Sequence, residues 1–234
     1  MLSAIIKVAA QNGNRQFESL DKISSNVANY NTTGFKAKRF EQFLTADGRI
    51  DGTIRVDTSV GDAMMTKRPM DVAIDGMGYI AVTQPDGKTV YTRDGSFELN
   101  SEGYLMTSHG DLVGNGIQLP VKRNQIQIKP TGEVLVQHNA GEKFKPVGQI
   151  TLVQFANPEK LQSLGYNRLA ATDESGEPKV DNQSALKQGF LERSNVNIYS
   201  QIEKILRLNA SVISEIKLIK FTDQIYQQAV NLKQ

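Results

Sequence analysis

A glycine-rich stretch at residues 76–81 has the spacing of a cofactor-binding motif. It reads G-M-G-Y-I-A, which fits the pattern G-x-G-x-x-A of dinucleotide-binding turns. In those turns the glycines open a helix whose N-terminus holds the pyrophosphate. Here Tyr79–Thr83 has the pattern of a strand and runs directly into the turn P-D-G at 85–87. We therefore interpret Gly76 and Gly78 as turn residues and expect no nucleotide cofactor.

Metal ligands and catalytic side chains are sparse in the sequence. Its histidines are His109 and His138 and it has no cysteine, so the usual ligands of a zinc site are missing. His109 precedes Gly110 and is expected to lie in a turn. No nucleophile-elbow pattern is present, and we expect separate carboxylates such as Asp71 and Asp75 to be solvated rather than catalytic. We therefore expect no catalytic, metal-binding or cofactor-binding residues and no enzyme activity.

The composition excludes several further classes of function. The chain has 234 residues, 39% of them hydrophobic, and its 27 basic and 25 acidic residues leave a net charge of +2. That balance favours neither nucleic acid nor an anionic membrane as a partner. No apolar run reaches the length of a membrane span, so we expect no membrane insertion. Residues 1–10 resemble a weak signal peptide, but Lys7 interrupts them and helical periodicity continues past any cleavage point, so we expect no cleaved signal.

The elements that organise the chain are two long amphipathic helices. Residues 195–234 contain no glycine and no proline, and Asn197 is placed to cap a helix there. Apolar residues recur at heptad spacing, and two polar residues occupy the same register, which predicts a seam that pairs with another helix. The seam consists of Ile198, Ile202, Ile205, Asn209, Val212, Ile216, Ile219, Asp223, Tyr226 and Val230. A second apolar strip consists of Leu206, Ile213, Leu218, Ile225 and Leu232.

The N-terminal helix is expected from about residue 3 to residue 28 and supplies a matching surface. Without burial, such a face does not offset the cost of ordering the backbone, about 1–2 kcal/mol per residue. We therefore expect both helices to be marginal in a lone monomer and to pair, as a coiled coil, with each other and with neighbouring copies. The alternative is that the C-terminal helix is a long core helix of a single domain. The N-terminal apolar face consists of Ile6, Ala9 or Ala10, Gly13, Phe17, Leu20, Ile23 and Val27.

The segment N-Y-N-T-T-G at residues 29–34 is expected to end the first helix. Gly34 should adopt a positive φ, and Phe35 should anchor the chain after the turn. Because the turn lies far from the β body in sequence, we expect Gly34→Val to leave the melting temperature of that body unchanged. Lys36, Lys38 and Arg39 are expected to form a solvated or rim-facing run. We interpret residues 35–69, which are polar and contain several glycines, as an extended linker.

Residues 70–189 consist of short alternating segments separated by turn residues, about eight to twelve positions apart. This pattern is typical of an antiparallel meander or a partly closed barrel. The expected fold class is therefore α+β with a mainly β body. The expected domains are the N-terminal helix at 1–34, the linker at 35–69, the antiparallel β body at 70–189 and the C-terminal helix at 190–234.

Four segments of the chain resemble the flagellar rod and hook proteins of bacteria. SLDKISSNVANYNTTGFKAKR at residues 19–39 is similar to the signature of that family. VYTRDGSFELNSEGYLMTSHGDLVGN at 90–115 and QITLVQFANPEKLQSLG at 149–165 resemble its body domain, and QGFLERSNVN at 188–197 resembles its entry into the C-terminal helix. The signature match is carried by Asn26, Ala28, Asn29, Asn31, Thr33, Gly34 and Phe35.

The resemblance implies a structural, non-enzymatic subunit of the flagellar basal-body rod, in a distal or a proximal position. Such a subunit assembles through its terminal helices into a hollow axial tube that transmits torque and lets exported subunits pass. Its implied partners are itself, other rod and hook subunits and the flagellar export apparatus. Its implied location is the periplasmic rod, reached without a cleaved signal peptide. The alternative is a secreted coiled-coil adhesin or surface-binding module with a β head.

The residues expected to form the assembly interface lie on both helices and at the end of the first one. They are Ile6, Phe17, Leu20, Ile23, Asn26, Val27, Asn29, Gly34, Phe35, Ile198, Ile202, Ile205, Asn209, Val212, Ile216, Ile219, Asp223 and Tyr226.

Overall fold

The computed structural model describes residues 2–44, 46, 50–120 and 122–231, with side chains for all of these except 2–10, 44, 50, 226, 229 and 230. The chain divides into two units that interleave in sequence. The helical unit comprises the described parts of residues 1–28, 38–56 and 196–234, and the β unit comprises those of residues 29–37 and 57–195. The first and the last described segments of the chain therefore belong to one unit.

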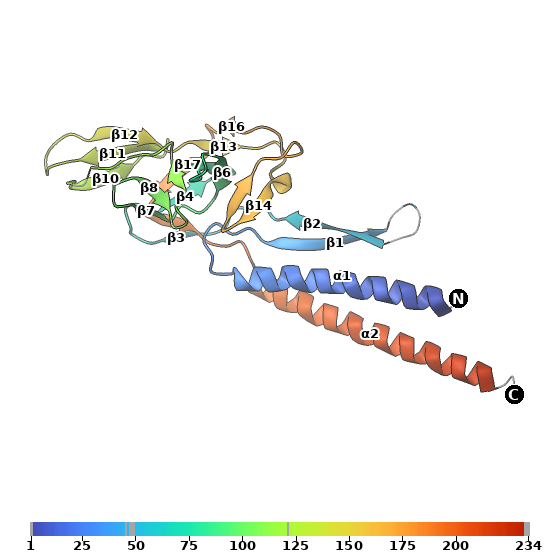
Figure 1. The fold of residues 1–234 in the computed structure, drawn as a ribbon. Helices are drawn as coiled ribbons and strands as arrows, with labels where there is room; N and C mark the ends of the chain where they lie inside the picture. Colours follow the sequence, from blue (N-terminus) through green and yellow to red (C-terminus); the bar gives the residue numbers. More distant parts are fainter. Residues whose placement is uncertain (1, 45, 47–49, 121, 232–234) are drawn as a thin grey trace. The chain divides into compact units, whose positions relative to one another are not determined.

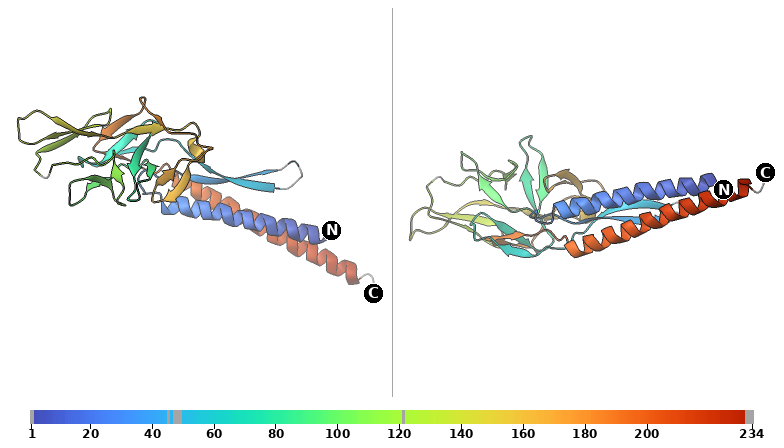
Figure 2. Two further views of the ribbon diagram at one scale, coloured as in Figure 1. Left: turned by 45° about the horizontal axis from the view of Figure 1, so that its top comes forward. Right: turned by 90° about the horizontal axis from the view of Figure 1, so that it is seen from below.

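The helical unit consists of two long helices and a β hairpin. Helix α1 (Leu2–Ala28) and helix α2 (Ile198–Asn231) lie side by side (Figures 1 and 2). Strand β1 (Lys38–Leu44) contacts α1 and pairs with β2 (Ile50–Val56). Both helices lie where the hydrophobic periodicity predicted them.

Asn197 caps α2 as predicted. Its side-chain oxygen accepts a hydrogen bond from the backbone N–H of Ser200 at 3.0 Å. That bond satisfies one of the N–H groups that the first turn of a helix leaves without an intrahelical partner.

The prediction of an extended linker at residues 35–69 was wrong, because much of this segment is strand. The hairpin of β1 and β2 is antiparallel along its length. The carboxylate of Glu41 lies 2.7 Å from Arg39 Nε and 2.6 Å from Arg55 Nε, so charged side chains on adjacent strands pair with one another. The polar composition that indicated a linker is thus that of a hairpin with paired charges on its surface.

Gly52, which was also interpreted as a linker residue, is required for packing in this hairpin. A Cβ atom at Gly52 would overlap the ring of Phe40 on the partner strand. The absence of a side chain therefore lets an aromatic ring cover the backbone of β2.

The β unit is built from short strands. They are β3 (Ala63–Met65), β4 (Val72–Asp75), β5 (Tyr79–Thr83), β6 (Thr89–Thr92), β7 (Phe97–Leu99), β8 (Leu105–Thr107), β9 (Leu112–Val113), β10 (Gln125–Ile128), β11 (Glu133–Gln137), β12 (Lys145–Gln149), β13 (Leu152–Gln154), β14 (Gln162–Gly165), β15 (Arg168–Ala170), β16 (Lys179–Val180), β17 (Ala185–Gln188) and β18 (Phe190–Glu192), with a 3-10 helix at Pro158–Lys160.

In the described residues, the main sheet of the β unit has nine strands. Its order is β14-β15-β6-β5-β9-β8-β7, and β13 pairs with both β5 and β16. Smaller sheets consist of β10-β11-β12, of β17 with β4, and of β18 with β3. These pairs are antiparallel, which confirms the mainly β, antiparallel architecture predicted from the alternating pattern.

The two units differ in how much they bury. The β unit has a continuous apolar core, and its fully buried side chains include Val72, Ile80, Phe97, Leu105, Leu119, Val134 and Ile150. Each such side chain contributes about 1.5–3 kcal/mol. Among the described side chains of the helical unit, only Ile23, Asn26, Val196 and Gln201 are buried. The β unit therefore has the core of an independent domain, and the described part of the helical unit does not.

Candidate assembly interface

Helix α2 carries large apolar side chains that stay exposed in the part of the chain that the structure describes. Tyr199 is 81% exposed and Leu206 is 64% exposed. The other exposed large apolar residues of the helix are Ile202, Ile213, Ile216, Leu218, Ile219, Phe221 and Ile225. Contiguous exposed apolar surface of this kind marks a site of protein association.

Helix α1 is also apolar on its outward side. Phe17 is 72% exposed, and Val27 and Leu20 are 40% and 37% exposed. Ile23 is buried, so α1 has an inner side that packs within the unit and an outer side that does not. Ile6 and Tyr226, which were predicted to belong to the interface, have side chains outside the part that the structure describes.

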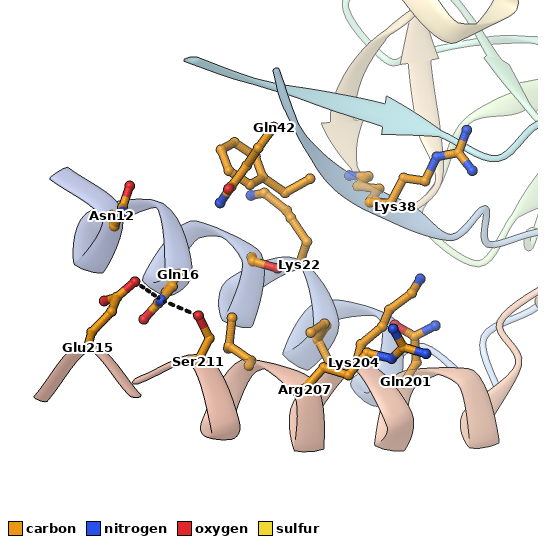
Figure 3. A pocket seen from close by; sticks show the side chains of 15 residues that line it. Asn12, Gln16, Lys22, Lys38, Gln42, Gln201, Lys204, Arg207, Ser211 and Glu215 are labelled. Carbon is orange, nitrogen blue, oxygen red and sulfur yellow. Dashed lines mark hydrogen bonds between the residues drawn. The ribbon is translucent and has the colours of Figure 1, made fainter. Parts of the chain in front are cut away.

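The contact between the two helices is partly polar. Gln16 of α1 donates from Nε2 to Ser211 Oγ at 3.2 Å and to Glu215 Oε1 at 2.8 Å (Figure 3). Both acceptors lie on α2. The surface of α2 that faces α1 therefore includes hydrogen-bonding side chains as well as apolar ones.

The predicted heptad seam of α2 divides between two sides of the helix. Ile198, Ile205 and Val212 are half-buried, as expected for a side that faces α1. The other described seam residues (Ile202, Asn209, Ile216, Ile219 and Asp223) are exposed in the single chain. Gln201, Leu208 and Glu215 are less exposed than those residues, and each lies next to a predicted seam position. The exposed members stay predicted interface residues.

Asn26 connects the elements of the helical unit through hydrogen bonds. Its Oδ1 accepts from the backbone N–H of Lys38 at 2.8 Å, and its Nδ2 donates to the carbonyl of Lys38 at 2.6 Å. The same Nδ2 donates to Oε1 of Gln201 at 3.1 Å. The Asn26 amide thus pairs with β1 as a neighbouring strand would and ties α1 to α2. It is 1% exposed, so its role is to position these elements within the chain.

The turn after α1 belongs to the β unit. Gly34 has the predicted positive φ, +68°, and Phe35 is buried as predicted. A Cβ atom at Gly34 would lie 2.6 Å from both the Arg93 carbonyl carbon and the Asp94 nitrogen. The expectation that Gly34→Val leaves the β body undisturbed was therefore wrong, because the glycine packs directly against the backbone of that body.

Two segments of the β unit that lie far apart in sequence are hydrogen-bonded to each other. The N–H of Gly34 donates to the carbonyl of Glu192 at 2.9 Å, and the N–H of Ala37 donates to Asn195 Oδ1 at 2.7 Å. The segment that follows α1 and the segment that precedes α2 are thus hydrogen-bonded to each other within this unit. Asn29 lies at the start of the first segment and closes the turn through its carbonyl, which accepts from Thr32 N at 3.1 Å.

A buried cluster of three charged side chains includes one residue from each of these two segments. Lys36 Nζ is 2.6 Å from Glu192 Oε1, and Arg93 Nε is 2.8 Å from Glu192 Oε2. The guanidinium of Arg93 also donates to the carbonyls of Gly78 at 2.6 Å and Gly76 at 3.0 Å. One carboxylate therefore balances two cations, and the cluster has a net charge of +1.

The prediction that Lys36 is solvated was wrong, since it is 8% exposed. Its ammonium group also donates to the carbonyl of Ser59. Burial lowers the pKa of Lys36, the positive charge of Arg93 lowers it further, and Glu192 offsets part of this effect. The family resemblance could have drawn attention to these residues, because Lys36, Arg93 and Glu192 each lie in one of the segments that resemble the rod and hook proteins. Nothing in the spacing of the residues indicated that they meet.

The remaining candidate sites carry little chemistry. Gly76 has a φ of +136° in the connection from β4 to β5, and β5 begins directly after Gly78, so their interpretation as turn residues is confirmed. His109 lies in a turn that the N–H of Gly110 closes by donating to Thr107 O at 3.0 Å. Within the described ranges there is no group of His, Cys, Asp or Glu placed to hold a metal. No described helix is long and apolar enough to span a membrane.

Asp71 contradicts the prediction that it is solvated, whereas Asp75 is exposed as expected. Asp71 is fully buried, and neither of its carboxylate oxygens has a hydrogen-bond donor among the described residues. The nearest cation is Arg68, whose Nε lies 3.6 Å from Oδ1. Arg68 and Asp71 are the first and last residues of one turn, which a backbone hydrogen bond of 3.2 Å closes.

Comparison with known proteins gives consistent matches along the chain. The family model described as "Flagella basal body rod protein" matches residues 9–36, and the one described as "Flagellar hook protein FlgE/F/G D1 domain" matches residues 73–136. The flagellar basal-body rod protein FlgG of Caulobacter vibrioides is 31% identical over 258 aligned positions, which cover 97% of this chain and 98% of the relative. FlgG of Bacillus subtilis is 33% identical over 255 positions, 94% and 96% of the two chains. The rod protein FlgF of Mesorhizobium japonicum is 29% identical over 224 positions, 90% of each chain.

Proposed function

The chain belongs to the family of flagellar basal-body rod proteins and is a structural subunit of the rod, and from this premise we propose that it self-assembles through the outward faces of α1 and α2. Its location is the flagellar basal body. The family assignment replaces the alternative of a secreted adhesin.

The observation that carries the proposal is the unequal burial of the two units. The helical unit leaves large apolar side chains exposed on both helices, among them Phe17, Tyr199 and Leu206. Burying one such side chain contributes about 1.5–3 kcal/mol. Contact with neighbouring copies is therefore the source of stability that the described helical unit lacks in a single chain.

In the assembly, the helical units line the inner wall of a hollow tube as a coiled coil, and the β units form the outer layer. The tube transmits torque and lets later subunits pass. Each subunit reaches the periplasmic rod through the flagellar export apparatus, and other rod and hook subunits are its neighbours. The relatives named FlgG, at 31% and 33% identity, support an FlgG-type over an FlgF-type subunit.

A charge placed on the outward face of α2 tests the proposal. Leu206 is exposed, so Leu206→Glu should leave the fold of the monomer intact, as judged by circular dichroism and thermal unfolding. It should abolish polymerisation of the purified protein and motility of cells that carry it. The matched control is Gln224→Glu, which places the same charge at an exposed polar position of the same helix. Wild-type polymerisation by Leu206→Glu would contradict assembly through this face.

A further inference from the structure

Helix α2 carries two heptad seams that are displaced by one residue. A series of buried and half-buried residues recurs at spacings of three and four, and the residue after each of them is exposed. The first series, here called the inner seam of α2, consists of Ile198, Gln201, Ile205, Leu208, Val212 and Glu215. The second series, here called the outer seam of α2, consists of Tyr199, Ile202, Leu206, Asn209, Ile213 and Ile216, and the same spacing continues to the exposed Lys220 and Asp223.

Helix α1 has the same arrangement in its described part. Its inner seam is buried or half-buried and consists of Asn12, Gln16, Ser19, Ile23 and Asn26. Its outer seam lies one residue further along and consists of Gly13, Phe17, Leu20, Ser24 and Val27, of which the last four are exposed.

The two inner seams face each other in the single chain. Gln16 donates to Glu215 at 2.8 Å and Asn26 donates to Gln201 at 3.1 Å, so α1 and α2 run antiparallel (Figure 1). One residue turns an α-helix by about 100°, so each outer seam lies beside its inner seam and not behind it. A helix with two such seams can contact a second helix next to the first, as in the wall of a tube.

The outer seam of α2 requires a different surface as its partner. If it packed against the outer seam of a second α2, one patch would meet itself, and a contact of that kind closes into a dimer. A rod subunit repeats its contact along the assembly, so this contact joins two different patches. The outer seam of α1 is the other exposed heptad seam in the described part of the helical unit.

We propose that the outer seam of α2 packs against the outer seam of α1 in a neighbouring copy, with Asn209 facing Ser24. This inference rests on the proposed function and adds the register in which adjacent subunits pair. In a tube whose subunits all point the same way along the axis, these two helices are antiparallel, as they are within the chain. The facing residues are then Val27 and Leu206, Ser24 and Asn209, Leu20 and Ile213, Phe17 and Ile216, and Gly13 and Lys220.

This register brings apolar residues opposite apolar residues. Phe17 and Leu20 each meet an isoleucine, whereas the polar Asn209 meets a serine. A polar residue within an apolar seam is a feature that fixes register. A shift of one heptad would place Phe17 opposite Asn209 in one direction and opposite Asp223 in the other. Either shift would bury a polar group against an aromatic ring without a hydrogen-bond partner there, which costs stability.

Gly13 supports the same register, because the described part of the chain gives it no packing role. A Cβ atom at Gly13 would have nothing within 4 Å. Glycine inside a helix costs about 1 kcal/mol relative to alanine. In the proposed register the long side chain of Lys220 lies over Gly13, and the missing side chain leaves room for its aliphatic stem.

Cysteine cross-linking tests the register, because the native chain has no cysteine. A chain with both Ser24→Cys and Asn209→Cys replaces the native one in cells, and isolated basal bodies are oxidised and run on a non-reducing gel. Facing seam positions bring the cysteines within the Cα separation of a disulfide, about 4.4–6.8 Å. Each subunit should link to two neighbours and give a ladder of covalent oligomers. Both positions are exposed, so the reduced monomer should melt as the native one does.

The matched control carries Ser24→Cys and Ser214→Cys. Ser214 is an exposed residue of α2 that belongs to neither seam. This variant should give no ladder, and neither should each single-cysteine variant. The pair Leu20→Cys and Ile213→Cys lies in the proposed register and should also give a ladder, so it decides the test if the first pair is not retained in basal bodies.

Three results would overturn the pairing while the proposed function stands. They are a product that ends at the dimer, a retained variant with facing cysteines that gives no ladder, and a ladder of equal intensity from the control with Ser214→Cys. If the native tagged protein is not recovered in basal bodies, the proposed function fails and this inference fails with it.

Discussion

The ammonium group of Lys36 lies 2.6 Å from the carboxylate of Glu192, although the two residues are 156 positions apart in the sequence and both are buried. Lys36 follows the turn after α1, and Glu192 precedes the entry into α2. With Arg93 as the second cation, this pair joins the segment after α1 to the segment before α2 within the β unit.

Because the cluster has one carboxylate and two cations, we expect its members to contribute unequally to the stability of the β unit. Glu192→Gln removes the carboxylate that pairs with both buried cations and should lower the free energy of unfolding of the β unit by about 3–5 kcal/mol. Lys36→Met leaves a balanced pair of Arg93 and Glu192 and should cost about 1 kcal/mol. Urea unfolding monitored on the β unit measures both.

The matched control for Glu192→Gln is Glu174→Gln. Glu174 pairs with Lys160 at 2.7 Å in the same unit, but both side chains are largely exposed. Its substitution should change stability little. A larger effect from Lys36→Met than from Glu192→Gln would show that the carboxylate is not the residue that balances the cluster.

The pKa of Lys36 predicts a specific dependence of stability on pH. Burial and Arg93 lower this pKa below 10.5 in the folded chain. Between the folded and unfolded pKa values the unfolded chain binds more protons, so the free energy of unfolding rises with pH there. Relative to Lys36→Met, the native protein should therefore gain stability as the pH rises toward 10.5. A difference between the two proteins that falls over this range would contradict the assignment.

Gly34 should tolerate no side chain, for two separable reasons. It has a positive φ, and a Cβ atom there would lie 2.6 Å from the backbone of Arg93 and Asp94. Gly110 also has a positive φ, +88°, but a Cβ atom there would have nothing within 4 Å. Gly110→Ala should thus cost only the backbone strain, about 1–2 kcal/mol, and Gly34→Ala should cost more. Equal melting temperatures for the two variants would rule out the close approach at Gly34.

Asn26 should be irreplaceable by aspartate. Asn26→Asp keeps the acceptor for the N–H of Lys38 but removes the donor to the carbonyl of Lys38 and to Gln201, at a cost of about 1–3 kcal/mol. Asn14→Asp, at an exposed position of the same helix, is the control. The helical circular dichroism signal of Asn26→Asp should be lost at a lower temperature than that of the native protein, whereas Asn14→Asp should melt as the native protein does. Identical curves would show that the amide donor is not needed.

Periodicity predicted the two helices but not which positions of α2 face α1. Apolar residues at Ile202 and Ile216 fit a heptad seam, yet in the single chain the polar Gln201 and Glu215 beside them are the less exposed ones. The reason is that Gln201 and Glu215 both accept hydrogen bonds from side chains of α1. A hydrophobic pattern does not detect such contacts.

Charged residues account for the other errors. Lys36 and Asp71 were expected to be solvated because isolated charges usually are, and the balancing partners of Lys36 lie far away in sequence. The hairpin of β1 and β2 was missed because its polar residues and Gly52 resembled a linker, although Phe40 and Ile54 lie opposite each other and Glu41 pairs with Arg55 across the strands. Contacts of this kind depend on tertiary structure, whereas the mainly β body follows from local alternation and turn residues.

The most direct test of the central claim is the location of the protein in the cell. A tagged copy that supports motility should be retained in isolated basal bodies, in the rod fraction, and Leu206→Glu should lose that retention while Gln224→Glu keeps it. A functional tagged protein that is recovered only outside the basal body would contradict its assignment as a structural subunit of the rod.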